Sequence, residues 1–141
     1  MSAEETKEIL DQEALTKQCR LYRLDPVGRI DRELQALTGE FIDSDVSLDA
    51  YEINQVDSMH YLGTDGTKTM LKCFPSSSRT MLDLGSGFGG CARFIAKKSI
   101  DDNITDMHVT ALELQENISN AGQTLTKRCS LNDSVSHVAG D

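Results

Sequence analysis

The chain has 141 residues, a formal net charge of −9, and a composition that is 38% hydrophobic and 26% charged, with only two prolines. These values suit one globular domain, and they exclude a collagen-like or wholly disordered chain. The acidic balance argues against a nucleic-acid partner, which would favour a basic surface. No apolar run approaches the roughly 20 residues that cross a bilayer, so we expect a cytoplasmic protein that does not enter a membrane.

The first part of the chain, residues 1–75, is expected to be a helical or lid segment. Helix-forming residues predict a helix over residues 3–24, and Asp25-Pro26 marks its end. A second helix is predicted over residues 29–37, where apolar residues recur at i, i+4 and i+7 and Gly39 supplies a stop signal. Both helices would precede the part of the chain that carries the motifs.

An acidic stretch follows these two helices. Residues 43–57 hold five acidic residues and little apolar surface, so an irregular segment is expected there. A short helix is then predicted up to Phe74, with Thr64 or Asp65 as its N-cap. Residues 75–78, Pro-Ser-Ser-Ser, read as a linker.

The remainder of the chain, residues 76–141, alternates strands with helices. Strands are predicted over residues 80–84, 107–114 and 135–138, and helices over residues 91–98 and 116–129. This β-α-β-α-β order predicts an α/β fold in which right-handed crossovers build a parallel sheet covered on both faces.

The cysteines and the short basic pairs have ordinary structural interpretations. The cysteines lie too far apart for a CxxC metal or redox pair, so we expect reduced core thiols and no metal site. The basic pairs are expected to be solvated helix ends. These residues are Cys19, Cys73, Cys91 and Cys129, and the pairs Lys97-Lys98 and Lys127-Arg128.

The glycine-rich stretch of residues 85–90, Gly-Ser-Gly-Phe-Gly-Gly, follows a predicted strand and opens a predicted helix. Such a loop lets the backbone approach a ligand closely, beside the amides of a helix N-terminus. Its glycine spacing also satisfies GxGxxG, which would suit NAD with Glu113 on a ribose. The glycines alone do not choose between cofactors.

Asp83, two residues before the first glycine, favours a different cofactor. A carboxylate at the mouth of the loop would repel a pyrophosphate, whereas it would stabilise the ammonium and sulfonium groups of S-adenosylmethionine. Glu113, near the end of the second strand, would then accept hydrogen bonds from both ribose hydroxyls. Asp141, after the third strand, would accept from the adenine amine. All three acids follow the strand ends where open α/β sheets bind ligands.

Three stretches resemble the first motifs of class I S-adenosylmethionine-dependent methyltransferases, in the right order. They are residues 82–90 (LDLGSGFGG), 109–114 (VTALEL) and 138–141 (VAGD). Glu113-Leu114-Gln115 with residues 125–129 is similar to the small-molecule N-methyltransferase branch that includes the sarcosine/dimethylglycine and phosphoethanolamine enzymes. Residues 55–64 (QVDSMHYLGT) resemble the segment before the core of the glycine and dimethylglycine enzymes.

The resemblance implies a Rossmann-like fold, S-adenosyl-L-methionine as cofactor and a small amine as methyl acceptor. It also implies roles for individual residues. Gly85, Ser86 and Gly87 would lie against the methionine moiety of the cofactor, with Asp83 nearby. Glu113 would bind the ribose, Leu114 would lie under the adenine, and Asp141 would bind the adenine amine. His60 and Tyr61 would face the reacting centre.

The chain departs from this family in its extent. The family's sheet has seven strands, whereas only the first β-α-β-α-β half is predicted here, so we expect an N-terminal fragment of a longer enzyme. Without the later strands, the first strand would leave its open edge and its apolar faces uncovered, which predicts marginal stability or association with another chain. Two alternatives stay open: an inert remnant that binds a cofactor or a partner, and, less favoured because of Asp83, an NAD-dependent oxidoreductase.

Overall fold

The computed structural model describes residues 25–58 and 62–141. The predicted helix over residues 3–24, Cys19 and the two candidate catalytic residues His60 and Tyr61 lie outside the described residues.

The described chain holds five helices and three strands. The helices are α2 (Pro26–Thr38), α3 (Ala50–Asp57), α4 (Gly63–Leu71), α5 (Gly90–Asp101) and α6 (Glu116–Arg128), and the strands are β1 (Thr80–Leu84), β2 (His108–Glu113) and β3 (Val135–Ala139). The β-α-β-α-β order predicted for residues 76–141 is therefore confirmed, with boundaries within three residues of those expected.

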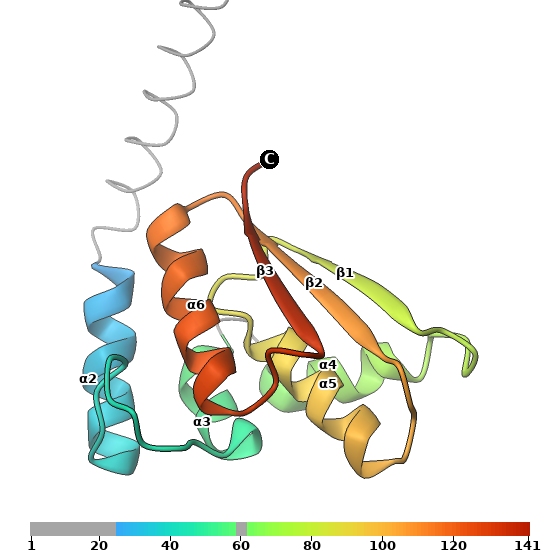
Figure 1. Cartoon of the computed structure of the whole chain (residues 1–141), viewed down its shortest axis with the longest axis horizontal. Coiled ribbons are helices and arrows are strands. Elements are labelled where there is room, and N and C mark those ends of the chain that lie inside the picture. The colour runs from blue at the N-terminus through green and yellow to red at the C-terminus, as the bar shows by residue number, and fades with distance from the viewer. Residues whose placement is uncertain (1–24, 59–61) are drawn as a thin grey trace, which may run out of the picture.

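The strands form a parallel sheet in the order β1-β2-β3, in which Asp83 is level with Ala111, and Ala111 with His137. Both crossovers step in the same direction across the sheet. Right-handed crossovers that step in one direction place their helices on the same face. Figure 1 shows the helices gathered on one side of the three strands. The expectation of a sheet covered on both faces is wrong for the described chain, because covering the second face needs crossovers that step in the opposite direction.

The two faces of the sheet consequently differ in burial. On the face toward α5 and α6, Val109 and Ala111 of β2 are fully buried, and Val135 of β3 is 3% exposed. On the opposite face, Leu82 and Leu84 of β1 are 60% and 69% exposed. The described chain therefore has a mixed α/β, Rossmann-like architecture with a three-stranded parallel sheet, of which one face is covered.

Two apolar clusters stabilise the covered side. One joins α2, α3 and α6 around Phe88 of the glycine loop, and the other joins α5 to β2 and β3. Phe88 is fully buried, so the glycine loop is anchored in the core by its one large side chain. The first half of the chain thus packs directly against the loop that carries the motif.

Helix α2 forms as its sequence predicts. Asp25 caps its N-terminus by accepting from the amide of Gly28 (3.0 Å), and Gly39 ends it in the left-handed conformation (φ 81°). Helix α4 begins at Gly63, earlier than expected, and neither Thr64 nor Asp65 is its N-cap. Thr64 instead donates its hydroxyl hydrogen to Oδ1 of Asn54 (2.9 Å), a buried residue of α3.

Helix α3 corrects the expectation of an irregular segment over residues 43–57. Two of the acids that suggested a solvated loop have specific partners. Asp49 caps the helix by accepting from the amides of Tyr51 (2.9 Å) and Glu52 (3.0 Å), and Asp57 is buried at its end. Ile53 is fully buried between them. A side-chain cap and two buried apolar residues, Ala50 and Ile53, therefore outweigh the acidic composition.

Two smaller expectations are also wrong. Cys73 is exposed rather than core filler, whereas Cys91 and Cys129 pack against the apolar clusters. Arg128 is not a solvated helix end. It is 7% exposed, and its guanidinium donates to the backbone carbonyls of Phe41, Ile42 and Val46, so it ties that loop to α6.

Candidate functional site

The glycine loop turns sharply between β1 and α5. Gly85, Gly87 and Gly89 have φ values of 67°, 55° and 77°, a region that side chains other than glycine rarely adopt. The amide of Ser86 donates to the carbonyl of Leu112 (3.0 Å), which fixes the loop to the neighbouring strand. Without the glycines this turn would be strained, so the motif has a conformational reason in this fold.

Glu113 holds the loop from the end of β2. Its two carboxylate oxygens accept from the amides of Gly87 and Gln115, each at 3.0 Å. A carboxylate has about four lone-pair sites, so both oxygens keep the capacity to accept from a ligand. The ribose role predicted for Glu113 remains a prediction. The geometry adds a task that the sequence had not suggested, which is to orient the loop.

A hollow of about 160 Å³ lies under the loop, between β1 and the end of α3. Asp83 contributes from the covered face of β1, and Gly85, Ser86 and Gly87 contribute from the loop. The remaining walls come from the α3 end and from the start of α5, and they are Asp57, Ser58, Gly90 and Cys91. The structure therefore brings four of the predicted cofactor residues to one cavity.

Several polar atoms at this hollow are buried without a hydrogen-bond partner among the described residues. They are Ser86 Oγ, Ser58 Oγ and Asp57 Oδ1. Buried polar groups in native proteins are almost always paired, so such a cluster indicates a ligand or water that completes it. Carboxylates and hydroxyls can accept several hydrogen bonds, which fits a cationic, donor-rich group and disfavours a phosphate.

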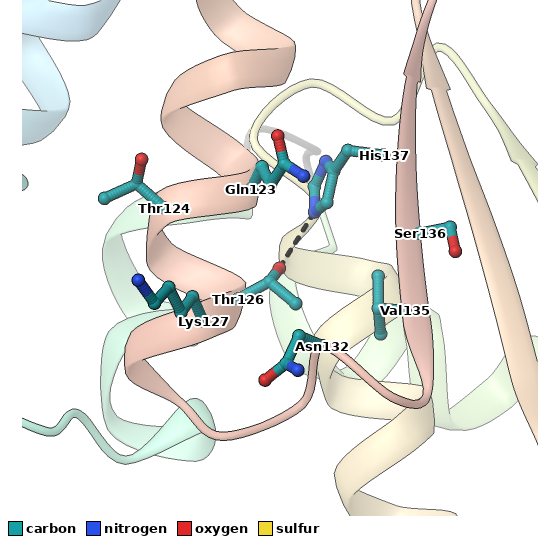
Figure 2. A pocket seen from close by; sticks show the side chains of 8 residues that line it. All are labelled: Gln123, Thr124, Thr126, Lys127, Asn132, Val135, Ser136 and His137. Carbon is teal, nitrogen blue, oxygen red and sulfur yellow. Dashed lines mark hydrogen bonds between the residues drawn. The ribbon is translucent and has the colours of Figure 1, made fainter.

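Directly below the hollow, a buried polar chain links three helices to the sheet. Arg93 of α5 is fully buried and pairs with Asp57 Oδ2. Its other nitrogen donates at 3.0 Å to the Gly122 carbonyl and to Thr126 Oγ1, and Thr126 Oγ1 lies 2.8 Å from His137 Nε2. Figure 2 shows His137 pointing from β3 to Thr126 on α6. This chain supports the floor of the loop.

Burial sets the charge states along this chain. Desolvation raises the pKa of the Asp57 carboxyl, and the adjacent Arg93 charge opposes that rise. Desolvation, reinforced by the charge of Arg93, lowers the pKa of His137 to about 4. His137 is therefore neutral at pH 7. Sequence reasoning missed Asp57, Arg93 and His137. The available signal was Arg93 itself, a charge within the apolar part of a predicted helix.

Close packing of His137 explains two further glycines. A Cβ atom on Gly122 would come within 2.7 Å of the His137 ring and 2.8 Å of the Phe88 carbonyl. A Cβ atom on Gly89 would also meet that ring, at 2.5 Å. The absence of side chains at Gly89 and Gly122 therefore lets the glycine loop, α6 and β3 pack closely together.

Beside this chain lies a groove of about 570 Å³ between α6 and β3. Most of the residues that line it have polar side chains, among them Gln123, Lys127, Asn132, Ser136 and His137. This groove and the hollow under the loop have no lining residue in common, and none of the predicted cofactor residues lines the groove.

The other predicted residues lie at or beyond the strand ends. Leu114 follows β2 and is 49% exposed. The Gly140 amide donates to the Glu113 carbonyl (3.0 Å), which places exposed Asp141 beside the end of β2. Among residues 25–58 and 62–141 there is no cluster of His, Cys, Asp and Glu that could hold a metal ion. In that same part of the chain, no helix has the length and apolarity needed to span a membrane.

No family model matches the chain. It is 32% identical over 80 residues to the tRNA1(Val) (adenine(37)-N6)-methyltransferase of Glaesserella parasuis serovar 5, a match that covers 57% of this chain and 32% of that protein. It is 21% identical to a protein from Galdieria sulphuraria assigned as a sarcosine dimethylglycine methyltransferase, with a TM-score of 0.47, covering 79% of this chain and 41% of the other.

The chain spans about a third of the length of the curated relative that it matches. The sequence similarity is to part of a methyltransferase, and it does not extend to a particular branch or substrate.

Proposed function

We propose that this chain carries the cofactor-binding part of an S-adenosylmethionine-dependent methyltransferase that acts on a small-molecule amine such as sarcosine or dimethylglycine. The observation that carries the proposal is the hollow under the glycine loop, with Asp83 in its wall and buried acceptor atoms around it. Such a lining favours the cationic amino-acid end of this cofactor.

The same lining argues against NAD. Asp57 and Asp83 both line the hollow beside the loop where a dinucleotide would place its pyrophosphate. Two carboxylates near a doubly anionic group would repel it in a partly desolvated site. An NAD-dependent oxidoreductase is therefore the less favoured assignment.

In the proposed site each residue binds or orients, and none has to supply acid or base strength. Gly85, Ser86 and Gly87 would hold the methionine moiety, Glu113 the ribose, Leu114 the face of the adenine and Asp141 its amine. When bound, the cofactor supplies an electrophilic methyl group on a sulfonium. His60 and Tyr61 would align the acceptor amine, because an in-line displacement depends on proximity and orientation.

The choice of a small amine rests on the resemblance of residues 55–64, 113–115 and 125–129 to small-molecule N-methyltransferases, and on the net charge of the chain. The sequence relative acts on a tRNA adenine by its name, which makes a nucleic acid the competing substrate. The net charge of −9 disfavours that substrate, because RNA binding relies on basic residues that neutralise phosphates.

Calorimetric titration of the full chain with S-adenosylhomocysteine tests the cofactor. We expect saturable binding, and we expect Glu113→Ala to weaken it by at least about tenfold, because hydrogen bonds to a charged acceptor are lost. Glu116→Ala, at an exposed position three residues along, is the matched control and should leave the affinity unchanged. NAD binding of equal strength would overturn the assignment.

Methyl transfer from labelled S-adenosylmethionine tests the substrate. The acceptors are glycine, sarcosine, dimethylglycine, phosphoethanolamine and a tRNA transcript. Label in one of the small amines, lost on Tyr61→Phe, would support the proposal. Label in the tRNA alone would show that the substrate class is wrong while leaving the cofactor assignment intact.

A second candidate function is a cofactor- or partner-binding module without activity, which associates with another chain through the open edge of β1. The exposed side chains of Leu82 and Leu84 on that strand favour it. Absence of methyl transfer to every acceptor, together with intact binding of S-adenosylhomocysteine and concentration-dependent sedimentation, would support this module over the enzyme.

A further inference from the structure

Asp57, the last residue of α3, has one carboxylate oxygen that is paired within the described chain and one that is not. The side chain is 1% exposed, and Oδ2 is paired with the buried guanidinium of Arg93. Oδ1 is buried and has no hydrogen-bond partner among the described residues. A buried carboxylate oxygen without a donor is costly, so the free oxygen calls for a partner from outside the described chain.

The position of Asp57 points to that partner. Asp57 lines the hollow under the glycine loop, together with Asp83 and Ser86. Gly90, the first residue of α5, leaves the space that Oδ1 occupies, because a Cβ atom there would collide with it. The absence of a side chain at Gly90 therefore brings the carboxylate up against the end of the loop.

We infer that Asp57 is a second carboxylate of the cofactor site, which accepts hydrogen bonds from the ammonium group of the cofactor's amino-acid moiety with the help of the Ser58 and Ser86 hydroxyls. The inference rests on the proposed function. It assigns a binding role to two residues of α3 and its C-cap, Asp57 and Ser58, which lie outside the glycine motif and the acids at the strand ends.

An ammonium group matches the chemistry of these walls. It offers three N–H donors and one positive charge, and the hollow offers buried hydroxyl oxygens on Ser58 and Ser86 and the free oxygen of Asp57. A carboxylate or phosphate placed there would face Asp57 and Asp83. Arg93 already compensates the single charge of Asp57, and the ligand ammonium would donate a charge-assisted hydrogen bond to the carboxylate oxygen that Arg93 leaves free.

The test is a set of titrations that separates the ammonium group from the rest of the ligand. The full chain is titrated with S-adenosylhomocysteine, with its analogue lacking only the amino group, and with 5′-methylthioadenosine, which lacks the whole amino-acid moiety. For the wild type we expect S-adenosylhomocysteine to bind at least about tenfold more tightly than the deaminated analogue, since a charge-assisted hydrogen bond is lost.

Asp57→Asn tests the residue itself. This substitution should weaken the binding of S-adenosylhomocysteine by about tenfold or more, and it should change the affinity for 5′-methylthioadenosine by no more than about twofold. Asp49→Asn is the control for charge, because Asp49 is exposed at the other end of the same helix and asparagine also caps helices. If Asp57→Asn weakens the binding of both ligands equally, Asp57 has only a structural role and the inference is overturned. Unchanged affinity for both ligands would also overturn it.

Ser58→Ala covers the case in which Asp57→Asn does not fold, as judged by circular dichroism. This substitution removes an unpartnered hydroxyl and leaves the Asp57–Arg93 pair intact, so the variant should fold. It should weaken the binding of S-adenosylhomocysteine more than the binding of 5′-methylthioadenosine. Equal wild-type affinity for S-adenosylhomocysteine and its deaminated analogue would overturn the ammonium assignment alone. Wild-type protein that binds none of the three ligands would overturn the proposed function, and this inference with it.

Discussion

The two faces of the sheet have the same three strands and opposite surroundings. On the face toward α5 and α6, β2 buries Val109 and Ala111, and even charged and polar groups such as Arg93 are enclosed. On the other face Leu82 and Leu84 keep more than half of their surface exposed. Strand sequence does not explain this difference, because β1 places Leu82 and Leu84 on the open face and the acidic Asp83 on the covered face. The direction in which the chain crosses from strand to strand explains it.

The comparison also shows where polar residues can be buried. Every polar link below the glycine loop lies on the covered side, from Asp57 through Arg93 and Thr126 to His137. Desolvation there makes each missing partner expensive, whereas the same change on the open face is solvated by water.

Removing one member of the buried ion pair should have the largest effect. Arg93→Ala leaves Asp57 charged and unpaired in the core, and we expect a loss of about 3–5 kcal/mol in the free energy of unfolding, measured by urea denaturation. The double variant Arg93→Met/Asp57→Leu removes both charges and should recover much of that loss. Equal losses in the single and double variants would show that the pair is not the source of the effect.

Leucines on the covered and open sides should respond differently to truncation. Leu125 of α6 is 1% exposed, and Leu125→Ala should cost about 2–5 kcal/mol because it leaves a cavity. Leu84→Ala removes the same atoms from a 69% exposed position and should change stability by at most about 0.5 kcal/mol. Comparable losses from both variants would mean that the second face is covered in solution.

The covered side should also respond to acid through His137. Its pKa is about 4 in the folded chain, against an ordinary value of 6.5. The unfolded chain therefore binds more protons between these values, so stability is complete above about pH 6.5 and falls as the pH is lowered toward 4. Thermal melts across this range should show the loss, and His137→Gln should reduce its slope. An unchanged slope would place the acid sensitivity at another group.

Charges on the open face should alter association with the least change in stability. Leu82→Lys/Leu84→Lys removes exposed apolar surface next to the free edge of β1. We expect the melting temperature to stay within a few degrees and any self-association seen by sedimentation velocity to decrease. Thr110→Lys on the same face, in the central strand, is a control that leaves the β1 leucines in place.

Local sequence determined the elements that carry the motif. The strand over Thr80–Leu84 was predicted at its exact bounds, and the helix ended by Gly39 was predicted from apolar spacing and a stop signal. The glycine loop was also predicted, and three of its glycines have left-handed φ values. These features depend on residues close together in the chain, where periodicity, capping and glycine conformation act directly.

Only the tertiary structure decided how distant residues are used. The acidic composition around Asp57 suggested a loop, yet Arg93, 36 residues away, makes that acid part of the core. Arg128 seemed a solvated helix end, yet carbonyls more than 80 residues away bury it. The half-sheet extent of the chain predicted uncovered apolar surface at the first strand, and Leu82 and Leu84 are exposed as expected. Which face stays open follows from the direction of the crossovers, which strand sequence does not encode. Charge and burial depend on neighbours in space, and the fold alone brings those neighbours together.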